Sequence, residues 1–155
     1  LKPRAHKDID IFFAGSPSPR RDALFEQLKR HGLRVESPFG LYGEARNRLM
    51  ERSKVFLNIH HRDGLNQLEE VRLSFLLANR CFVISEDSDS DPYQGGVVFC
   101  PYENLVETCL RYVADPTATR EATAEIGYNI MLERPMIDFL RPIWTELTQK
   151  IDNQN

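Results

Sequence analysis

The sequence predicts an α/β domain in which one parallel sheet is covered by helices on both faces. Short apolar runs alternate along the chain with segments of helical length and period. Several of the runs, such as residues 81–85, are nearly continuously apolar, which is typical of a strand buried on both faces. The length of 155 residues fits one domain with its own core, and 41% hydrophobic residues exclude a disordered chain.

The first half of the chain supplies three expected strands, at residues 10–14, 33–36 and 54–60. Between the first two we expect a helix with Leu24, Phe25 and Leu28 on one face, ended by His31 and Gly32. A short polar helix is expected at residues 44–52, before the third strand, and another helix at residues 66–79, after it.

The second half supplies two more expected strands, at residues 81–85 and 97–100, separated by an acidic loop at residues 86–95. A helix is expected at residues 102–114, and a helix of about 16 residues after Asp115 and Pro116. The final helix starts near Pro135, and its apolar residues recur at alternating intervals of three and four: Ile137, Leu140, Trp144, Leu147 and Ile151. This spacing predicts one apolar face, for which packing on its own domain is one of two open readings.

Bulk composition excludes several classes of protein. The net charge of −3 gives no general attraction for nucleic acid or anionic membranes. The three cysteines, Cys81, Cys100 and Cys109, lie in apolar segments without close spacing, so we expect buried thiols and neither disulfides nor a zinc site. No apolar run approaches about 18 residues and no signal peptide is recognisable, so we expect a cytoplasmic chain without a transmembrane segment. Because the sequence begins with Leu1, we expect a piece of a longer protein.

An open parallel sheet binds ligands at the carboxyl ends of its strands, where the strand order reverses. The first expected strand is followed by Gly15 and Ser16, and the next helix begins with Arg20 and Arg21. A helix N-terminus with arginines is a good phosphate site. Basic residues oppose the helix dipole in a first turn, which favours an anionic ligand; the alternative is that both arginines are solvated surface. The loop lacks the dinucleotide pattern GxGxxG.

The third expected strand leads to a second set of polar residues, which includes His60, Asp63, Glu69 and Arg72. A carboxylate near the start of the following helix is suited to two sugar hydroxyls. Glu69 and Arg72 lie three positions apart and could instead pair with each other. His60 and His61 alternate at the strand end, so only one of them faces the cleft. No spacing of metal ligands is present, and we expect no metal.

Several segments resemble, in order, the C-terminal domain of group 1 glycosyltransferases with the GT-B fold, most closely their CgeB-like branch. They are the opening strand DIFFAGS, the loop PFGLYGEAR, the segment LNIH, the helix VRLSFLLANR and the stretch GGVVFCPYENLVETCLRYVADP. The resemblance covers nearly the whole chain. It implies a single Rossmann-like, nucleotide-sugar-binding domain over residues 1–155, with five or six parallel strands and extra C-terminal helices.

The resemblance also implies roles for individual residues. The donor would be a nucleoside diphosphate sugar, such as a UDP- or GDP-sugar, used without a metal or other cofactor. Gly15 and Ser16 would form the loop at the diphosphate, which Arg20 or Arg21 would hold. The loop with Phe39 and Tyr42 would contact the base. Glu69 or Glu70, of which Glu69 fits better, would bind the ribose beside Arg72, and His60 and Asp63 are the candidates for catalysis. The family's pair of glutamates is not reproduced at its usual spacing.

Such enzymes work in a cleft between this domain and a preceding acceptor domain, to which the family's last helix crosses back. We therefore expect a chain that binds donor but transfers sugar poorly alone. Two other readings stay open: a nucleotide-binding or protein-interaction module without catalysis, and an enzyme similar to nucleoside deoxyribosyltransferases, with Glu69 or Glu86 as nucleophile.

Overall fold

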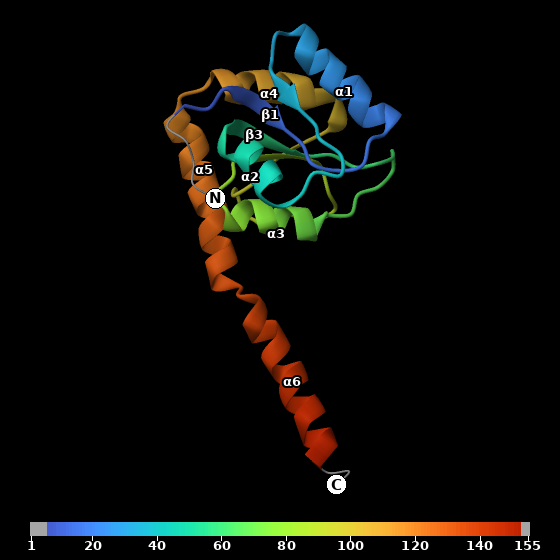
Figure 1. The fold of residues 1–155 in the computed structure, drawn as a ribbon, viewed down its shortest axis with the longest axis vertical. Helices are drawn as coiled ribbons and strands as arrows, with labels where there is room; N and C mark the ends of the chain where they lie inside the picture. Colours follow the sequence, from blue (N-terminus) through green and yellow to red (C-terminus); the bar gives the residue numbers. More distant parts are fainter. Residues whose placement is uncertain (1–5, 153–155) are drawn as a thin grey trace.

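The computed structural model describes residues 6–152 and the side chains of residues 6–149. Strands and helices alternate along the chain to the end of the sheet, except that the last two strands follow one another without a helix between them (Figure 1). In chain order the elements are β1 (Ile9–Phe12), α1 (Pro19–Arg30), β2 (Val35–Glu36), α2 (Gly43–Glu51), β3 (Ser53–Asn58), α3 (Glu70–Ala78), β4 (Val83–Glu86), β5 (Val98–Cys100), η1 (Tyr102–Asn104), α4 (Leu105–Ala114), α5 (Thr117–Glu133) and α6 (Met136–Asp152).

The five strands form one sheet in the order β2-β1-β3-β4-β5, and every neighbouring pair is parallel. This confirms the predicted α/β fold of Rossmann-like type. From β1 the chain moves outward to β2 on one side, and then returns to place β3, β4 and β5 on the other side. The strand order therefore reverses between β1 and β3, where Phe12 is in register with Phe56. That pair marks the position at which sheets of this kind bind ligands.

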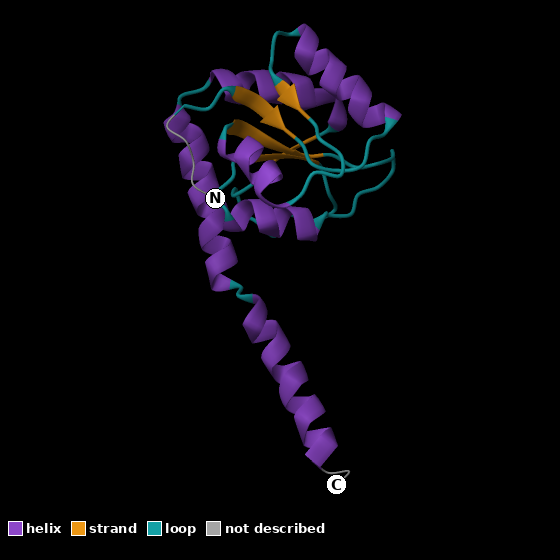
Figure 2. Cartoon of the chain, viewed as in Figure 1, coloured by secondary structure: helices purple, strands orange, loops and turns teal. Residues whose placement is uncertain are grey.

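Helices cover both faces of the sheet (Figure 2). Helices α1 and α4 pack on one face, and α2 and α3 pack on the other. Helix α5 contacts α3 and contributes to both cores, with Ala124 in the first and Ile130 and Met131 against the second. Successive strand residues point to opposite faces, so Val55 and Leu57 join the first core while Phe56 joins the second. All three cysteines are buried free thiols, as predicted. Burial raises the pKa of the Cys81 thiol to about 12.

Several boundaries differ from the sequence prediction. The strand β2 has two residues instead of four, and β3 ends at Asn58 instead of residue 60. The helix expected from residue 66 begins at Glu70. The reason is that Asn66 exchanges hydrogen bonds with Asp89 of the acidic loop: its amide donates to the Asp89 carboxylate (3.1 Å), and its carbonyl accepts from the Asp89 N–H (3.2 Å). Residues 59–69 are therefore an irregular loop at the edge of the sheet.

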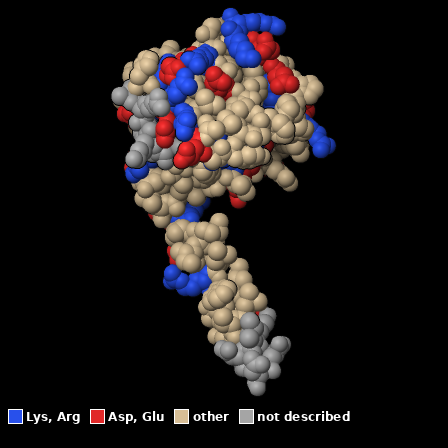
Figure 3. Space-filling model, in the orientation of Figure 1, with Lys and Arg blue, Asp and Glu red and all other residues tan. Residues whose placement is uncertain are grey.

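The last helix, α6, projects away from the domain (Figure 1). The reading in which its apolar face packs on its own domain is wrong, while the reading in which this helix reaches a preceding domain stays a prediction. Ile137, Leu140, Trp144 and Leu147 are 50% to 69% exposed, while the side chain of Ile151 lies outside the described residues. The coloured part of α6 in Figure 3 is mostly uncharged surface. Within residues 6–152 no helix has the length and apolarity that crossing a bilayer requires.

Candidate functional site

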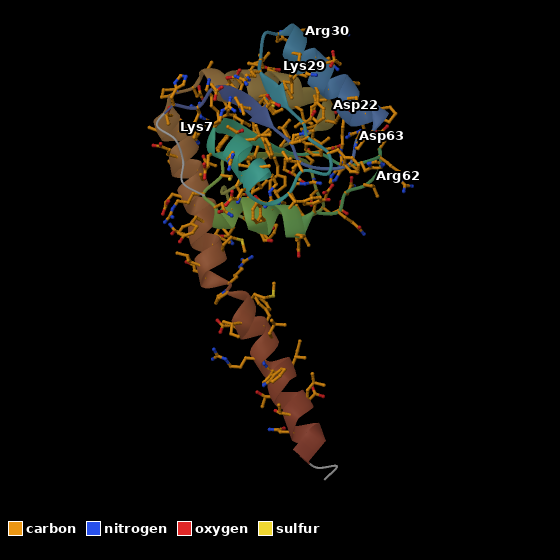
Figure 4. The ribbon with its side chains drawn as sticks, viewed as in Figure 1. Lys7, Asp22, Lys29, Arg30, Arg62 and Asp63 are labelled. Atoms are coloured by element: carbon orange, nitrogen blue, oxygen red, sulfur yellow. The ribbon has the colours of Figure 1, made fainter. Side chains whose placement is uncertain are left out.

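A network of charged side chains occupies the carboxyl edge of the sheet at the β1/β3 reversal. Three arginines and three carboxylates contribute to it: Arg20, Arg21, Arg72, Asp63, Glu69 and Glu86. They come from the start of α1, the loop after β3, the start of α3 and the end of β4. Figure 4 shows Asp63 and Arg62 at the same edge of the domain as Asp22 of α1. The structure thus brings together the two loops that the sequence singled out.

Arg20 lies at the centre of the exposed part of the network. Its guanidinium makes a two-point contact with the Glu86 carboxylate, in which Nη1 donates to Oε2 at 2.7 Å. Its Nε donates to Asp63, and its face covers the Tyr102 ring at 3.6 Å from the centroid. Burial disfavours the charged form, but the hydrogen bonds to Glu86 and Asp63 outweigh it and raise the pKa of Arg20. The side chain of Asp63 is 89% exposed, whereas that of Glu86 is 10% exposed.

Arg21 is a buried clamp between loops. Its side chain is 2% exposed. Nε donates to the main-chain carbonyl of Ile59 at 3.1 Å, Nη1 donates to the carbonyl of Ser16 at 2.8 Å, and Nη2 donates to Glu69 at 3.2 Å. Desolvation lowers the pKa of Arg21, with partial compensation from Glu69. Its donors hold the loops after β1 and β3 together, so of the two candidates for the diphosphate Arg20 is the more available.

Glu69 and Arg72 continue the network toward the middle of the sheet. Glu69 accepts from Arg21 through Oε1 and from Arg72 through Oε2, so the predicted pairing of Glu69 with Arg72 is present. Arg72 also donates to Oδ1 of Asn58 at 2.8 Å. Gly15 lies against this group, because a β-carbon on it would meet the Phe13 ring at 2.7 Å and Nη2 of Arg72 at 3.0 Å. A side chain at position 15 would push the loop and the arginine apart.

The two histidines after β3 have different surroundings. His60 is 2% exposed; its N–H donates to Glu86 and its ring Nε2 donates to the carbonyl of Asp87 at 2.9 Å. His61 is exposed, and its Nδ1 lies 3.5 Å from both the Ser16 hydroxyl and Nη1 of Arg21. Only one histidine faces the network, as the alternation predicts, and it is His61. The ring of His60 is thus buried and hydrogen-bonded to the main chain, and its catalytic role stays a prediction.

An open cavity of about 600 Å³ lies beside the network, between α2, α3 and the ends of β1 and β3. Its walls are mainly apolar, with Phe12, Met50, Phe56 and Leu76 among them, and Arg46, Glu69 and Arg72 supply its charged groups. Such a size falls within the ordinary range for small-molecule sites. Phe39 and Tyr42 are 69% and 76% exposed and do not line it. The aromatic rings in its walls are those of Phe12, Phe56 and Phe75.

Sequence reasoning assigned no donor-binding role to four residues that the geometry brings to this region: Asn58, Glu86, Tyr102 and Arg46. Glu86 and Asn58 end their strands, which is where the rule that sites follow strand ends points. Tyr102 follows β5 after one proline, and its hydroxyl donates to the carbonyl of Arg20 at 2.7 Å. Arg46 ends the segment PFGLYGEAR, and it reaches the cavity from the middle of α2.

No family model matches the chain. Its sequence is similar to uncharacterized protein L140 of Acanthamoeba polyphaga mimivirus, with 31% identity over 134 residues, which are 83% of this chain and 44% of L140. It is also similar to uncharacterized protein L138 of the same virus, with 35% identity over 106 residues, 64% of this chain and 12% of L138. The chain therefore spans less than half the length of these curated relatives.

Proposed function

We propose that this domain binds a nucleoside diphosphate sugar at the β1/β3 reversal and serves as the donor-binding domain of a glycosyltransferase. One observation carries the proposal: Arg20, in the first turn of α1, is balanced on its Nε side by a carboxylate on an exposed loop. A ligand phosphate can take the place of Asp63 without disturbing the packing of the domain, since the Asp63 side chain is 89% exposed. The N-terminus of α1 adds its dipole to the same position.

The ribose of the donor would lie at Glu69. Each of its oxygens accepts one arginine donor, and an ionised carboxylate has about four acceptor sites. Two sites are therefore left for the vicinal hydroxyls of a ribose. Glu70 does not line the cavity, which favours Glu69 for this role.

In the transfer step an acceptor hydroxyl oxygen would bond to the anomeric carbon and give its proton to a base, for which Asp63 and His61 are the candidates. The bond between that carbon and the diphosphate oxygen breaks, and its electron pair leaves with the diphosphate. Arg20 and the helix dipole would stabilise that charge, which requires no metal. Asp63 stays the proposed acidic group near the sugar, and His61 replaces His60 as the candidate histidine. The acceptor would be bound by a second domain. We therefore expect this chain to bind the donor without efficient transfer of the sugar.

A binding module without catalysis is the second candidate, and the two-point pairing of Arg20 with Glu86 favours it, because an internally neutralised arginine attracts anions less. The deoxyribosyltransferase-like reading is not proposed. Its nucleophile would be Glu69 or Glu86, and arginine hydrogen bonds hold both carboxylates, which reduces their nucleophilicity.

Isothermal titration of the chain with UDP, GDP, ADP and the corresponding glucose derivatives tests the proposal. We expect at least one nucleotide to bind, and Arg20→Met to weaken it about tenfold or more, equivalent to roughly 1.4 kcal/mol. Arg30→Met, at the exposed end of the same helix, is the matched control and should leave the affinity unchanged. Absence of binding at millimolar nucleotide would overturn the proposal. Efficient sugar transfer by this chain alone would refute its donor-domain part.

A further inference from the structure

We infer that the cavity between α2 and α3 holds the base of the nucleotide and that Arg46 selects guanine. This inference rests on the proposed function, which places the diphosphate at Arg20 and the ribose at Glu69. Glu69 and Arg46 both line the same cavity. A ribose at Glu69 would therefore place its base in a cavity that Arg46 also lines.

The walls of the cavity suit a flat ring. Phe12 and Phe56 meet edge to face at 5.7 Å between centroids, and Met50, Leu57 and Leu76 extend the apolar surface. The volume of about 600 Å³ leaves room for a purine together with part of its ribose. Apolar walls with a few convergent polar groups are the usual composition of a site for such a ring.

Arg46 has unused hydrogen-bonding capacity. Its guanidinium lies over the Phe75 ring at 4.3 Å from the centroid, which fixes its plane. Nη2 donates to Oδ1 of Asn47 at 3.3 Å, and Nε is buried without an acceptor among the described residues. A buried charged donor without an acceptor is unfavourable. A small shift of the side chain toward a ligand acceptor would remove this cost on binding.

A guanidinium only donates, so it prefers a ring edge with two neighbouring acceptors. Guanine presents O6 and N7 in this way, which is why arginine pairs with it in two-point contacts. Adenine offers N7 beside the N6 amino donor, and the O4 of uracil stands beside the donor N3–H. Cytosine has neighbouring acceptors in N3 and O2, but its O2 stands beside the ring nitrogen that carries the ribose. Of the common bases, guanine alone presents two neighbouring acceptors away from the ribose attachment.

The test is a titration of the chain with GDP, IDP, ADP and UDP. IDP keeps O6 and N7 but lacks the 2-amino group, so it isolates the edge that Arg46 would read. We expect GDP and IDP to bind about tenfold or more tightly than ADP and UDP, as one two-point contact provides. Arg46→Met keeps the apolar stem and should reduce this preference to about twofold, with little change for UDP.

Arg48→Met is the matched control, since Arg48 is exposed on the same helix and lies outside the cavity. It should preserve the preference. Equal affinities of wild type for GDP and UDP, or a preference that survives Arg46→Met, would overturn the inference while leaving Arg20-dependent nucleotide binding in place. Absence of binding by all four nucleotides would overturn the proposed function and the inference together. The comparison of IDP with ADP on wild type decides the base preference even if the Arg46 variant fails to fold.

Discussion

Arg20 and Glu86 lie 66 positions apart in the chain and form a two-point ion pair across the carboxyl edge of the sheet. Glu86 also accepts the N–H of His60, so the end of β4 fixes both the arginine and the loop after β3. Because Glu86 occupies the two terminal nitrogens of Arg20, the Nε side is the part that can exchange partners. Asp63 occupies that side now.

Replacing Asp63, the partner on the Nε side of Arg20, should therefore strengthen the binding of anions. Asp63→Asn removes the carboxylate that competes for Arg20, so we expect nucleoside diphosphates to bind roughly twofold to fivefold more tightly, within the range of one exposed ion pair. The measurement is calorimetric titration at low and physiological salt. Asp138→Asn on the projecting α6 removes the same charge far from the site and should change nothing. Weaker binding by Asp63→Asn would mean that Asp63 supports the ligand instead of competing with it.

Arg21 should matter for stability more than for ligand affinity. Arg21→Lys keeps the charge but loses the fork that spans the carbonyls of Ile59 and Ser16. Leaving these buried carbonyls and Glu69 with fewer partners should lower the free energy of unfolding by about 2–4 kcal/mol. Urea denaturation followed by circular dichroism measures the loss. Arg30→Lys, exposed on the same helix, is the control. If Arg21→Lys lowers the free energy of unfolding by less than about 0.5 kcal/mol, Arg21 does not stabilise the two loops as proposed.

The fold was predictable from the sequence because buried parallel strands leave nearly continuous apolar runs. The reversal between β1 and β3 was not, since the runs give the strands but not their order. The different surroundings of Arg20 and Arg21 could not be predicted either. Both residues begin one helix, and what separates them is the Ile59 carbonyl, 38 positions away, which only Arg21 reaches. The spacing of apolar residues in α6 could not show exposure, because the same pattern occurs in packed and unpacked helices.

A close approach of two glycines holds α5 against the sheet. A β-carbon on Gly127 would meet Leu77 Cδ2 at 2.7 Å and the Gly96 carbonyl oxygen at 2.9 Å, and one on Gly96 would meet the Gly127 Cα at 2.5 Å. Gly127→Ala should therefore destabilise the domain by about 1–3 kcal/mol, despite the better helix propensity of alanine. Thermal unfolding measures the effect, and Asn129→Ala, exposed on the same helix, is the control. A gain in stability for Gly127→Ala would show that α5 does not pack this closely.

Removal of α6 should leave the domain folded. None of its described side chains is buried, and Met136, Phe139 and Ile143 are 55% to 69% exposed. A chain ending at Arg134 keeps every residue of both cores. We expect its melting temperature to stay within about 2 °C of the full chain, which corresponds to less than roughly 1 kcal/mol for a domain of this size. The nucleotide affinity should also stay unchanged, since no residue of the charged network or the cavity comes from α6. A drop of the melting temperature by about 10 °C would mean that the apolar face of α6 packs on the domain in solution.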